Sequence, residues 1–149
     1  MSIPKVIYYC WFGGKPLPKT AKKCIASWKK YCPEYKIIRI DESNADFTKN
    51  IYANQAYKAK KWAFVTDYYR LKVIYENGGI YLDTDVELIK SLNPLAEKYD
   101  GFFGYECGKN LIATGLGFGA EKGNKFVKAI KHPEWLFGVI LRRLFAKVL

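Results

Sequence analysis

The segment from Asn77 to Val86 constrains the fold of this chain most, because a helical pattern ends there and a strand pattern begins. Two glycines, Gly78 and Gly79, follow Asn77 and provide a natural helix stop. Beyond them, apolar and polar residues alternate as far as Leu88, which is the period-2 pattern of a half-buried strand. We therefore predict a helix that ends at the glycines and a buried strand that follows directly.

The alternation places two carboxylates, Asp83 and Asp85, on one side of the predicted strand together with Tyr81. With about 3.3 Å of rise per residue, their Cα atoms would lie roughly 6–7 Å apart, close enough to serve one metal–diphosphate complex. Carboxylate oxygens suit Mg²⁺ or Mn²⁺, which usually complete their shells with water and substrate phosphates. An isolated Asp-x-Asp is more often a solvated acidic turn. Here it follows a helix, a glycine stop and a buried strand, and open α/β sheets bind ligands at such strand ends.

The segment Trp62–Asn77 carries the strongest helical pattern in the chain. Its predicted apolar stripe consists of Phe64, Tyr68, Leu71 and Tyr75. Asp67 and Arg70 lie three residues apart on one face, and an ordinary surface ion pair of this kind contributes about a few tenths of a kcal/mol. The functional alternative is a carboxylate and a guanidinium held beside the Asp-x-Asp pair, able to bind sugar hydroxyls and phosphate.

The N-terminal part predicts a strand, a helix and a second strand, at Val6–Trp11, Thr20–Tyr31 and Tyr35–Ile40. This βαβ unit lacks the phosphate-binding patterns G-x-G-x-x-G and G-x-x-x-x-G-K-[ST], which disfavours a Rossmann dehydrogenase and a P-loop NTPase. Trp11, at the strand's tip, is either a core tryptophan or a flat platform for a nucleotide base. The segment 88–95 is expected to lead out of the acidic strand, and later segments predict strands at 101–106 and 113–120 and a helix at 122–130.

Composition indicates one compact domain, because 149 residues that are 50% hydrophobic can bury a core. The net charge of +11 favours a polyanionic partner, such as nucleic acid, anionic lipid or a nucleoside diphosphate. The four cysteines form no C-x-x-C pair and have no regular spacing, which indicates reduced thiols in a cytosolic protein and neither zinc nor disulfides.

The segment Trp135–Leu149 predicts a basic amphipathic helix. It can lie on an anionic membrane, pack as a core helix, or be a hydrophobic end left exposed because the chain stops early. We accordingly divide the chain into a domain at 1–131 and a helix at 132–149. We expect a cytoplasmic protein, peripheral on the inner membrane face.

Three motifs occur in order over residues 3 to 130: Ile3-Pro4-Lys5-Val6-Ile7 followed by Trp11-Phe12-Gly13-Gly14, then Ala63-x-x-Thr66-Asp67-x-x-Arg70, then Gly78-Gly79-Ile80-Tyr81-Leu82-Asp83-x-Asp85-Val86. With these motifs the chain resembles the DXD-containing sugar transferases of glycosyltransferase family 32, which include capsular-polysaccharide and mannosyl transferases. It is more distantly similar to the glucosylating domain of large clostridial toxins. The resemblance implies an α/β fold of the GT-A type, a UDP- or GDP-sugar donor, Mn²⁺ or Mg²⁺, and retention of anomeric configuration.

The resemblance also implies roles for individual residues. The residues implied to bind the substrate are Trp11, Thr66, Asp67, Arg70 and Tyr81. Of these, Trp11 stacks on the base, Asp67 and Arg70 hold the donor sugar and its phosphate side, and Tyr81 lines the pocket. The implied catalytic and metal-binding carboxylates are Asp83, which contacts ribose or donor sugar, and Asp85, which binds the metal. A metal at the β-phosphate would stabilise the charge that develops as the nucleoside diphosphate leaves.

Two departures from the family pattern stand out. Tyr8 occupies the place of a usual histidine. The family also continues to a later His-containing segment near Ser-Trp that helps to close the donor site, so we expect a C-terminally truncated domain.

The function predicted from the sequence is metal-dependent transfer of a sugar to a glycan or lipid-linked acceptor in cell-surface polysaccharide synthesis. One alternative is a truncated, catalytically impaired member that only binds nucleotide or membrane. The other is a basic nucleic-acid-binding protein, which is disfavoured because no recognised nucleic-acid motif accompanies the lysines.

Overall fold

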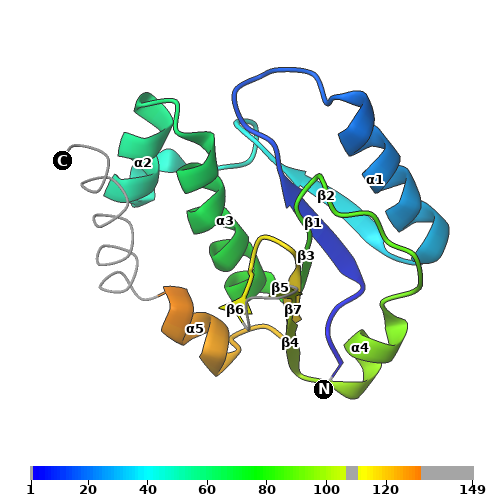
Figure 1. Cartoon of the computed structure of the whole chain (residues 1–149). Helices are drawn as coiled ribbons and strands as arrows, with labels where there is room; N and C mark the ends of the chain where they lie inside the picture. The colour runs from blue at the N-terminus through cyan, green and yellow to red at the C-terminus, as the bar shows by residue number, and fades with distance from the viewer. Residues whose placement is uncertain (1, 107–110, 132–149) are drawn as a thin grey trace.

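The computed structural model describes residues 2–106 and 111–131, which form an α/β fold (Figure 1). In chain order its elements are β1 (Val6–Cys10), α1 (Lys19–Tyr31), β2 (Lys36–Ile40), the 3-10 helix η1 (Phe47–Lys49), α2 (Ile51–Lys58), α3 (Trp62–Asn77), β3 (Gly79–Tyr81), α4 (Asn93–Lys98), β4 (Gly101–Phe103), β5 (Tyr105–Glu106), β6 (Leu111–Ile112), β7 (Phe118–Ala120) and α5 (Lys125–Lys131). Within the described residues, no helix is both long and apolar enough to span a bilayer. The predicted helix Trp135–Leu149 lies outside them, and the division at residue 131 stays a prediction.

The main sheet has five strands in the order β2-β1-β3-β7-β4. β1 pairs in parallel with β2 and β3, whereas β7 runs antiparallel to β3 and β4. The predicted opening unit of strand, helix and strand is present as β1, α1 and β2, and β5 pairs with β6 in a separate hairpin. The mixed α/β fold predicted from the sequence is confirmed, and it is consistent with the GT-A type.

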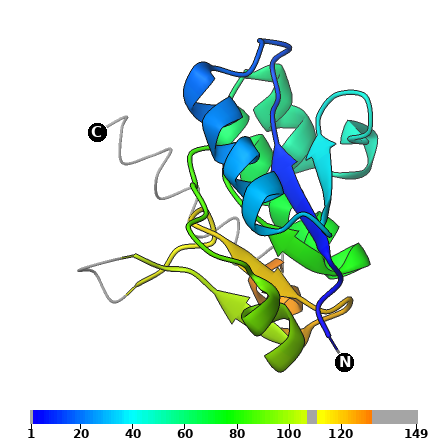
Figure 2. The same ribbon diagram turned by 90° about the vertical axis from the view of Figure 1, so that its right-hand side faces the viewer.

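Side chains alternate along β1, and this alternation creates one core on each face of the sheet. Ile7 and Tyr9 pack in a cluster with Trp28 of α1, whereas Tyr8 and Cys10 pack in a second cluster with residues of α2, α3 and α5. Figures 1 and 2 show the sheet between these two groups of helices, with α1 and α4 on one side and α3 on the other.

The strand predicted to run from Ile80 to Leu88 is shorter than expected. β3 ends at Tyr81, and the N–H of Val86 donates to the carbonyl of Asp83 at 3.1 Å, which closes a turn over residues 83–86. The predicted apolar face is nevertheless present, because Val86 packs against the same cluster as Ile80. The strand stops because the backbone groups after the turn find their partners on α1 instead of on a neighbouring strand.

Helix α3 has the predicted bounds, but its buried side is displaced from the predicted stripe. Of the predicted stripe only Leu71 is buried, whereas Phe64, Tyr68 and Tyr75 are partly exposed. The buried residues of α3 are Val65, Tyr69, Leu71, Val73 and Ile74. The buried arc is wide because α3 contacts α2 and α5 as well as β1 and β3.

The segment 88–95, predicted as the exit from the acidic strand, contains no strand, and from Asn93 it forms α4, where Pro94 occupies the first turn, a position that suits its fixed φ. The segment 113–120 is a strand only from Phe118, because the N–H of Leu116 donates to the carbonyl of Ala113 and forms a turn.

The backbone between α3 and β3 requires glycine at both Gly78 and Gly79. Gly78 and Gly79 have φ angles of 71° and 120°, which L side chains rarely adopt. A Cβ atom on Gly79 would lie 2.9 Å from the carbonyl oxygen of Val6 and 2.9 Å from a ring carbon of Tyr8. The glycine therefore allows β3 to approach β1 directly after the end of α3.

We expect Gly79→Ala to lower the free energy of unfolding by about 3 kcal/mol, because backbone strain and overpacking each cost roughly 1–3 kcal/mol. The matched control is Gly123→Ala, since Gly123 has a φ of 74° but no neighbouring atom within 4 Å of a built Cβ. It should lose only about 1 kcal/mol from strain. Urea unfolding measures both losses, and equal values would contradict the packing argument.

Candidate active site

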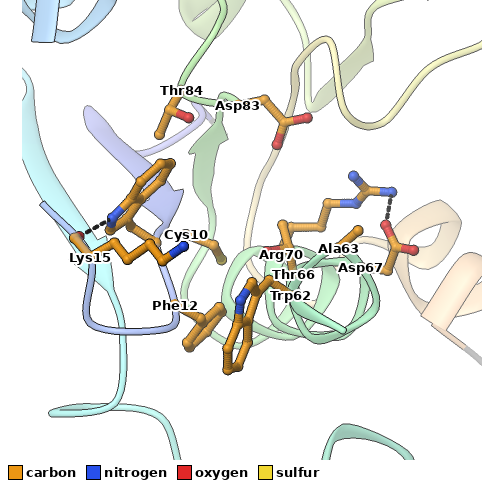
Figure 3. A pocket seen from close by; sticks show the side chains of 11 residues that line it. Cys10, Phe12, Lys15, Trp62, Ala63, Thr66, Asp67, Arg70, Asp83 and Thr84 are labelled. Atoms are coloured by element: carbon orange, nitrogen blue, oxygen red, sulfur yellow. Dashed lines mark hydrogen bonds and ion pairs between the residues drawn. The ribbon is translucent and has the colours of Figure 1, made fainter. Parts of the chain in front are cut away.

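A cavity of about 370 Å³ opens at the carboxyl ends of β1 and β3, beside the N-terminal half of α3 (Figure 3). The lining residues are Cys10, Trp11, Phe12, Lys15, Trp62, Ala63, Thr66, Asp67, Arg70, Asp83 and Thr84. The volume lies within the range of small-molecule sites. Because β1 and β3 are parallel and adjacent, their carboxyl ends meet at this edge, where open α/β sheets bind ligands.

One end of the cavity is aromatic, with Trp11, Phe12 and Trp62 in its wall. Trp11 is partly buried, and it both lines the cavity and packs against the core cluster that contains Tyr9 and Trp28. Its indole N–H donates to the carbonyl of Lys15 at 2.6 Å, which fixes the ring. Trp62 was not predicted as a site residue, although its place directly before the Ala63-x-x-Thr66 motif was a signal.

The other end of the cavity is charged. A guanidinium nitrogen of Arg70 lies 2.6 Å from a carboxylate oxygen of Asp67, and the two side chains are 17% and 28% exposed (Figure 3). This pair is therefore more buried than the solvated surface pair considered from the sequence. The Nε atom of Arg70 is also buried and has no hydrogen-bond partner among the described residues, a state that calls for a ligand or water. Thr66 lies one turn earlier on the same wall.

Asp83 forms the wall between β3 and the charged pair. The hydroxyl of Tyr81 donates to its Oδ1 atom at 2.7 Å. A Cβ atom on Gly115 would lie 2.8 Å from Oδ2 of Asp83 and 3.4 Å from Nη1 of Arg70, so the backbone of Gly115 closes the other side. Gly115 was not predicted as a site residue, and its only signal was the glycine-rich run at 115–119.

Tyr81 does not line the cavity as predicted. Its side chain is 1% exposed and packs in the core between β3 and α3, because it points to the same face as Tyr8 and Cys10. Only its hydroxyl reaches the site, where it holds Asp83. Tyr81 is therefore placed to orient a carboxylate and not to contact a ligand.

Burial controls the ionisation of two groups at the site. Burial, with a smaller effect of the nearby charges of Asp85 and Asp67, raises the pKa of Asp83 above its ordinary value, against the hydrogen bond from Tyr81 and the charge of Arg70. Burial also raises the pKa of the Cys10 thiol to about 12. Cys10 is therefore a neutral thiol in the cavity wall, because nucleophilic cysteines need a lowered pKa.

Asp85 lies in the turn after β3, where it is exposed and outside the cavity lining. Asp83 and Asp85 are the first and third residues of this turn, and they do not stand on a strand as predicted. The described residues contain no group of three or more His, Cys, Asp or Glu that could hold a metal ion. Two carboxylates nevertheless fit Mg²⁺ or Mn²⁺, because these ions are usually held by one or two carboxylates together with substrate phosphates.

The chain matches the family described as "Glycosyltransferase sugar-binding region containing DXD motif" over residues 18–102. The matched range includes α3, Asp83 and Asp85, although Trp11 and Gly115 lie outside it. The chain belongs to this family. It is accordingly an enzyme of sugar transfer, and membership implies a nucleotide-sugar donor, an acceptor and, in general, a divalent metal.

Comparison with one solved structure supports the fold. "PaToxG Glycosyltransferase" is similar with a TM-score of 0.67 and 18% identity, covering 95% of this chain and 70% of that chain. A glycosyltransferase involved in the glycosylation of the major capsid of PBCV-1 is similar with a TM-score of 0.46 and 13% identity, covering 98% of this chain and 78% of that one. The search of curated proteins found no match.

The raised pKa of Asp83 predicts a dependence of stability on pH in metal-free buffer. The folded state holds the Asp83 proton more tightly than the unfolded state, so this group favours folding at low pH. That contribution is lost as the pH rises through the raised pKa, above which the buried charge disfavours folding. We expect Asp83→Asn to be more stable than the unmodified chain at neutral pH, with the difference vanishing below about pH 4.

Urea unfolding at a series of pH values measures this effect. Asp85→Asn is the matched control, and its stability should change little because Asp85 is exposed. An Asp83→Asn variant that is less stable at neutral pH would show that the contacts of the carboxylate with Tyr81 and Arg70 outweigh its burial.

Proposed function

We propose that this enzyme transfers a sugar from a UDP- or GDP-sugar to a glycan or lipid-linked acceptor, with Mn²⁺ or Mg²⁺ as cofactor. One observation carries the proposal: a single cavity has aromatic rings at one end and a half-buried guanidinium–carboxylate pair at the other. A nucleotide sugar has the matching order of a flat base, a charged diphosphate and a hydroxyl-rich sugar.

Trp11 is the proposed platform for the base. Its ring is fixed by the bond to Lys15 and faces the cavity, so it can stack on a base without a further loss of freedom. Stacking of a base on an aromatic side chain contributes about 1–3 kcal/mol. Phe12 and Trp62 widen this apolar wall.

Arg70 and Asp67 are the proposed ligands of the donor sugar and its phosphate side. The guanidinium offers several donors in a fixed plane, and the carboxylate accepts from hydroxyls. Because the two side chains already hold each other at 2.6 Å, the donor meets an ordered pair. Thr66, on the same wall, adds a hydroxyl that can donate or accept.

Asp85, together with Asp83, is the proposed holder of the metal. When bound, a divalent ion there acts as a Lewis acid that stabilises the negative charge of the departing nucleoside diphosphate. The two carboxylates differ in setting, because Asp83 is fixed by Tyr81 and faces the cavity, whereas Asp85 is exposed and can meet the ion from solvent. We therefore assign the metal chiefly to Asp85 and the donor's ribose or sugar to Asp83.

We further propose transfer with retention of anomeric configuration. An inverting reaction requires a general base that accepts the acceptor's proton. In the proposed complex Asp67 and Asp83, the two carboxylates that line the described cavity, bind the donor. The retention that the family resemblance implies supports the proposal, and the anomeric signal of the product in proton NMR tests it.

The metal assignment is tested with Asp85→Asn, and Glu87→Gln is the matched control because it neutralises an exposed carboxylate of the same loop. UDP, GDP and a panel of their sugars are titrated by calorimetry with and without Mn²⁺. We expect Asp85→Asn to weaken metal-dependent binding at least about tenfold, with a change in unfolding free energy below about 0.5 kcal/mol. Glu87→Gln should behave like the unmodified chain.

If nucleotide binding by Asp85→Asn kept the same metal dependence, the metal would be bound by other residues. Absence of binding to every donor by the folded, unmodified chain would contradict the proposed function and leave the alternative of an impaired family member. Transfer or slow hydrolysis of one bound donor would identify the sugar.

We also propose a cytoplasmic protein that acts in cell-surface polysaccharide synthesis and binds the inner membrane face through residues 135–149. The net charge of +11 supports this, because an anionic leaflet attracts each basic residue near its surface by about 1 kcal/mol. A lipid-linked acceptor would be found at that surface.

Liposome sedimentation tests the membrane proposal on the full chain. Replacing Arg142, Arg143 and Lys147 by Gln should abolish sedimentation with anionic vesicles, because it removes the cations of the apolar tail. The control replaces Lys22, Lys29 and Lys30, exposed residues of α1, and should keep most binding. Sedimentation without lipid, or equal losses in both variants, would contradict a specific membrane role for the tail.

A further inference from the structure

We propose that Trp28 of α1, with Ser27 beside it, is a positioning residue for the metal-binding carboxylate of Asp85. The inference rests on the proposed function, in which Asp85 holds the metal. Neither α1 residue lines the cavity, so each acts through the backbone of the loop that carries Asp85.

The turn over residues 83–86 is held at both ends by different parts of the fold. At its start, the N–H of Leu82 donates to the carbonyl of Tyr8 at 3.1 Å, and the Tyr81 hydroxyl holds Asp83. At its end, the indole N–H of Trp28 donates to the carbonyl of Val86 at 2.7 Å. Val86 directly follows Asp85, so the Trp28 bond acts within one residue of the proposed metal ligand.

Trp28 is a rigid anchor. Its side chain is 0% exposed, and its ring packs edge-on against Tyr9 of β1, with 5.8 Å between the ring centroids and 65° between the planes. A fully buried indole in such a contact has little freedom to move. The N–H donor that meets Val86 is therefore fixed relative to β1, which also supplies one end of the cavity.

Ser27 binds the same loop two residues after Val86, at Leu88. Its hydroxyl oxygen accepts from the N–H of Leu88 at 2.9 Å and donates to the carbonyl of Cys24 at 2.6 Å. Lys23 and Glu87 form an ion pair at 3.1 Å, but both are exposed, so it contributes little. Figure 1 shows the loop leaving β3 and passing along α1 toward α4.

This attachment matters for function because a metal ligand must be held close to its productive place, and partners behind the ligand commonly change metal affinity 10–100-fold. Asp85 is exposed in a turn outside the regular strand. Its position therefore depends on the turn, whose far end is fixed by α1.

The test uses Trp28→Phe, which keeps an aromatic ring and removes the indole N–H. UDP and GDP are the probes, and the Mn²⁺ concentration that gives half-maximal nucleotide binding is measured by calorimetry. We expect this concentration to rise about tenfold. Nucleotide binding in the absence of metal should stay within about twofold of the unmodified chain, because the cavity wall is not changed.

Tyr35→Phe is the matched control, since Tyr35 is also buried and its hydroxyl donates to Asn93 at 3.0 Å, at the start of α4. It should leave the metal requirement unchanged. Ser27→Ala is a second, smaller change that tests the positioning role if Trp28→Phe does not fold. Ser27→Thr keeps a hydroxyl, so the Mn²⁺ concentration for half-maximal nucleotide binding should stay that of the unmodified chain.

The proposal is overturned if Trp28→Phe and Ser27→Ala match the Tyr35→Phe control, or if metal-free nucleotide binding falls as much as metal-dependent binding. Asp85→Asn separates this failure from that of the proposed function. If Asp85→Asn loses the metal dependence and the α1 variants do not, only the positioning role fails. If Asp85→Asn keeps the metal dependence, the metal assignment fails and the positioning role fails with it.

Discussion

The parallel pairing of β3 with β1 is the interaction on which the site depends. It follows directly on the end of α3, and it is possible because Gly79 has no Cβ to meet Val6 and Tyr8. The pairing brings the carboxyl end of β1, which carries Trp11, beside the carboxyl end of β3, which carries Asp83. Because α3 leads into the same strand, its Arg70 and Asp67 face the same edge. The short strand β3 thus brings side chains from the end of β1, from its own end and from α3 to one site.

The site contains a buried carboxylate whose loss of hydration is only partly compensated, as is typical of a binding centre. Asp83 is largely withdrawn from water, which raises its pKa, and the Tyr81 hydroxyl and the Arg70 charge compensate only part of that cost. Gly115 closes the same wall without a side chain, so the carboxylate stays packed against the backbone. A bound donor and metal would supply the missing partners, which is consistent with an enzyme of the DXD glycosyltransferase family.

Much of the fold could be predicted because its signals are local. The bounds of α3, the βαβ opening and the facing of Ile80 and Tyr81 follow from periodicity and from the two glycines. The end of β3 could not be predicted, because it depends on Trp28 and Ser27, which lie 58 and 61 residues before the loop residues that they bind, Val86 and Leu88. Trp62 and Gly115 were missed for the same kind of reason, since only the tertiary fold brings them to the cavity. The roles of the predicted site residues stay predictions.

We propose that the cavity binds a nucleoside diphosphate between Trp11 and a metal held at Asp85. A crystal structure with UDP or GDP and Mn²⁺, with anomalous diffraction collected at the manganese edge, tests it most directly. We expect a manganese peak within bonding distance of the Asp85 carboxylate and of the diphosphate, with the base stacked on the Trp11 ring. A manganese peak away from Asp85, or a nucleotide bound outside this cavity, would contradict it.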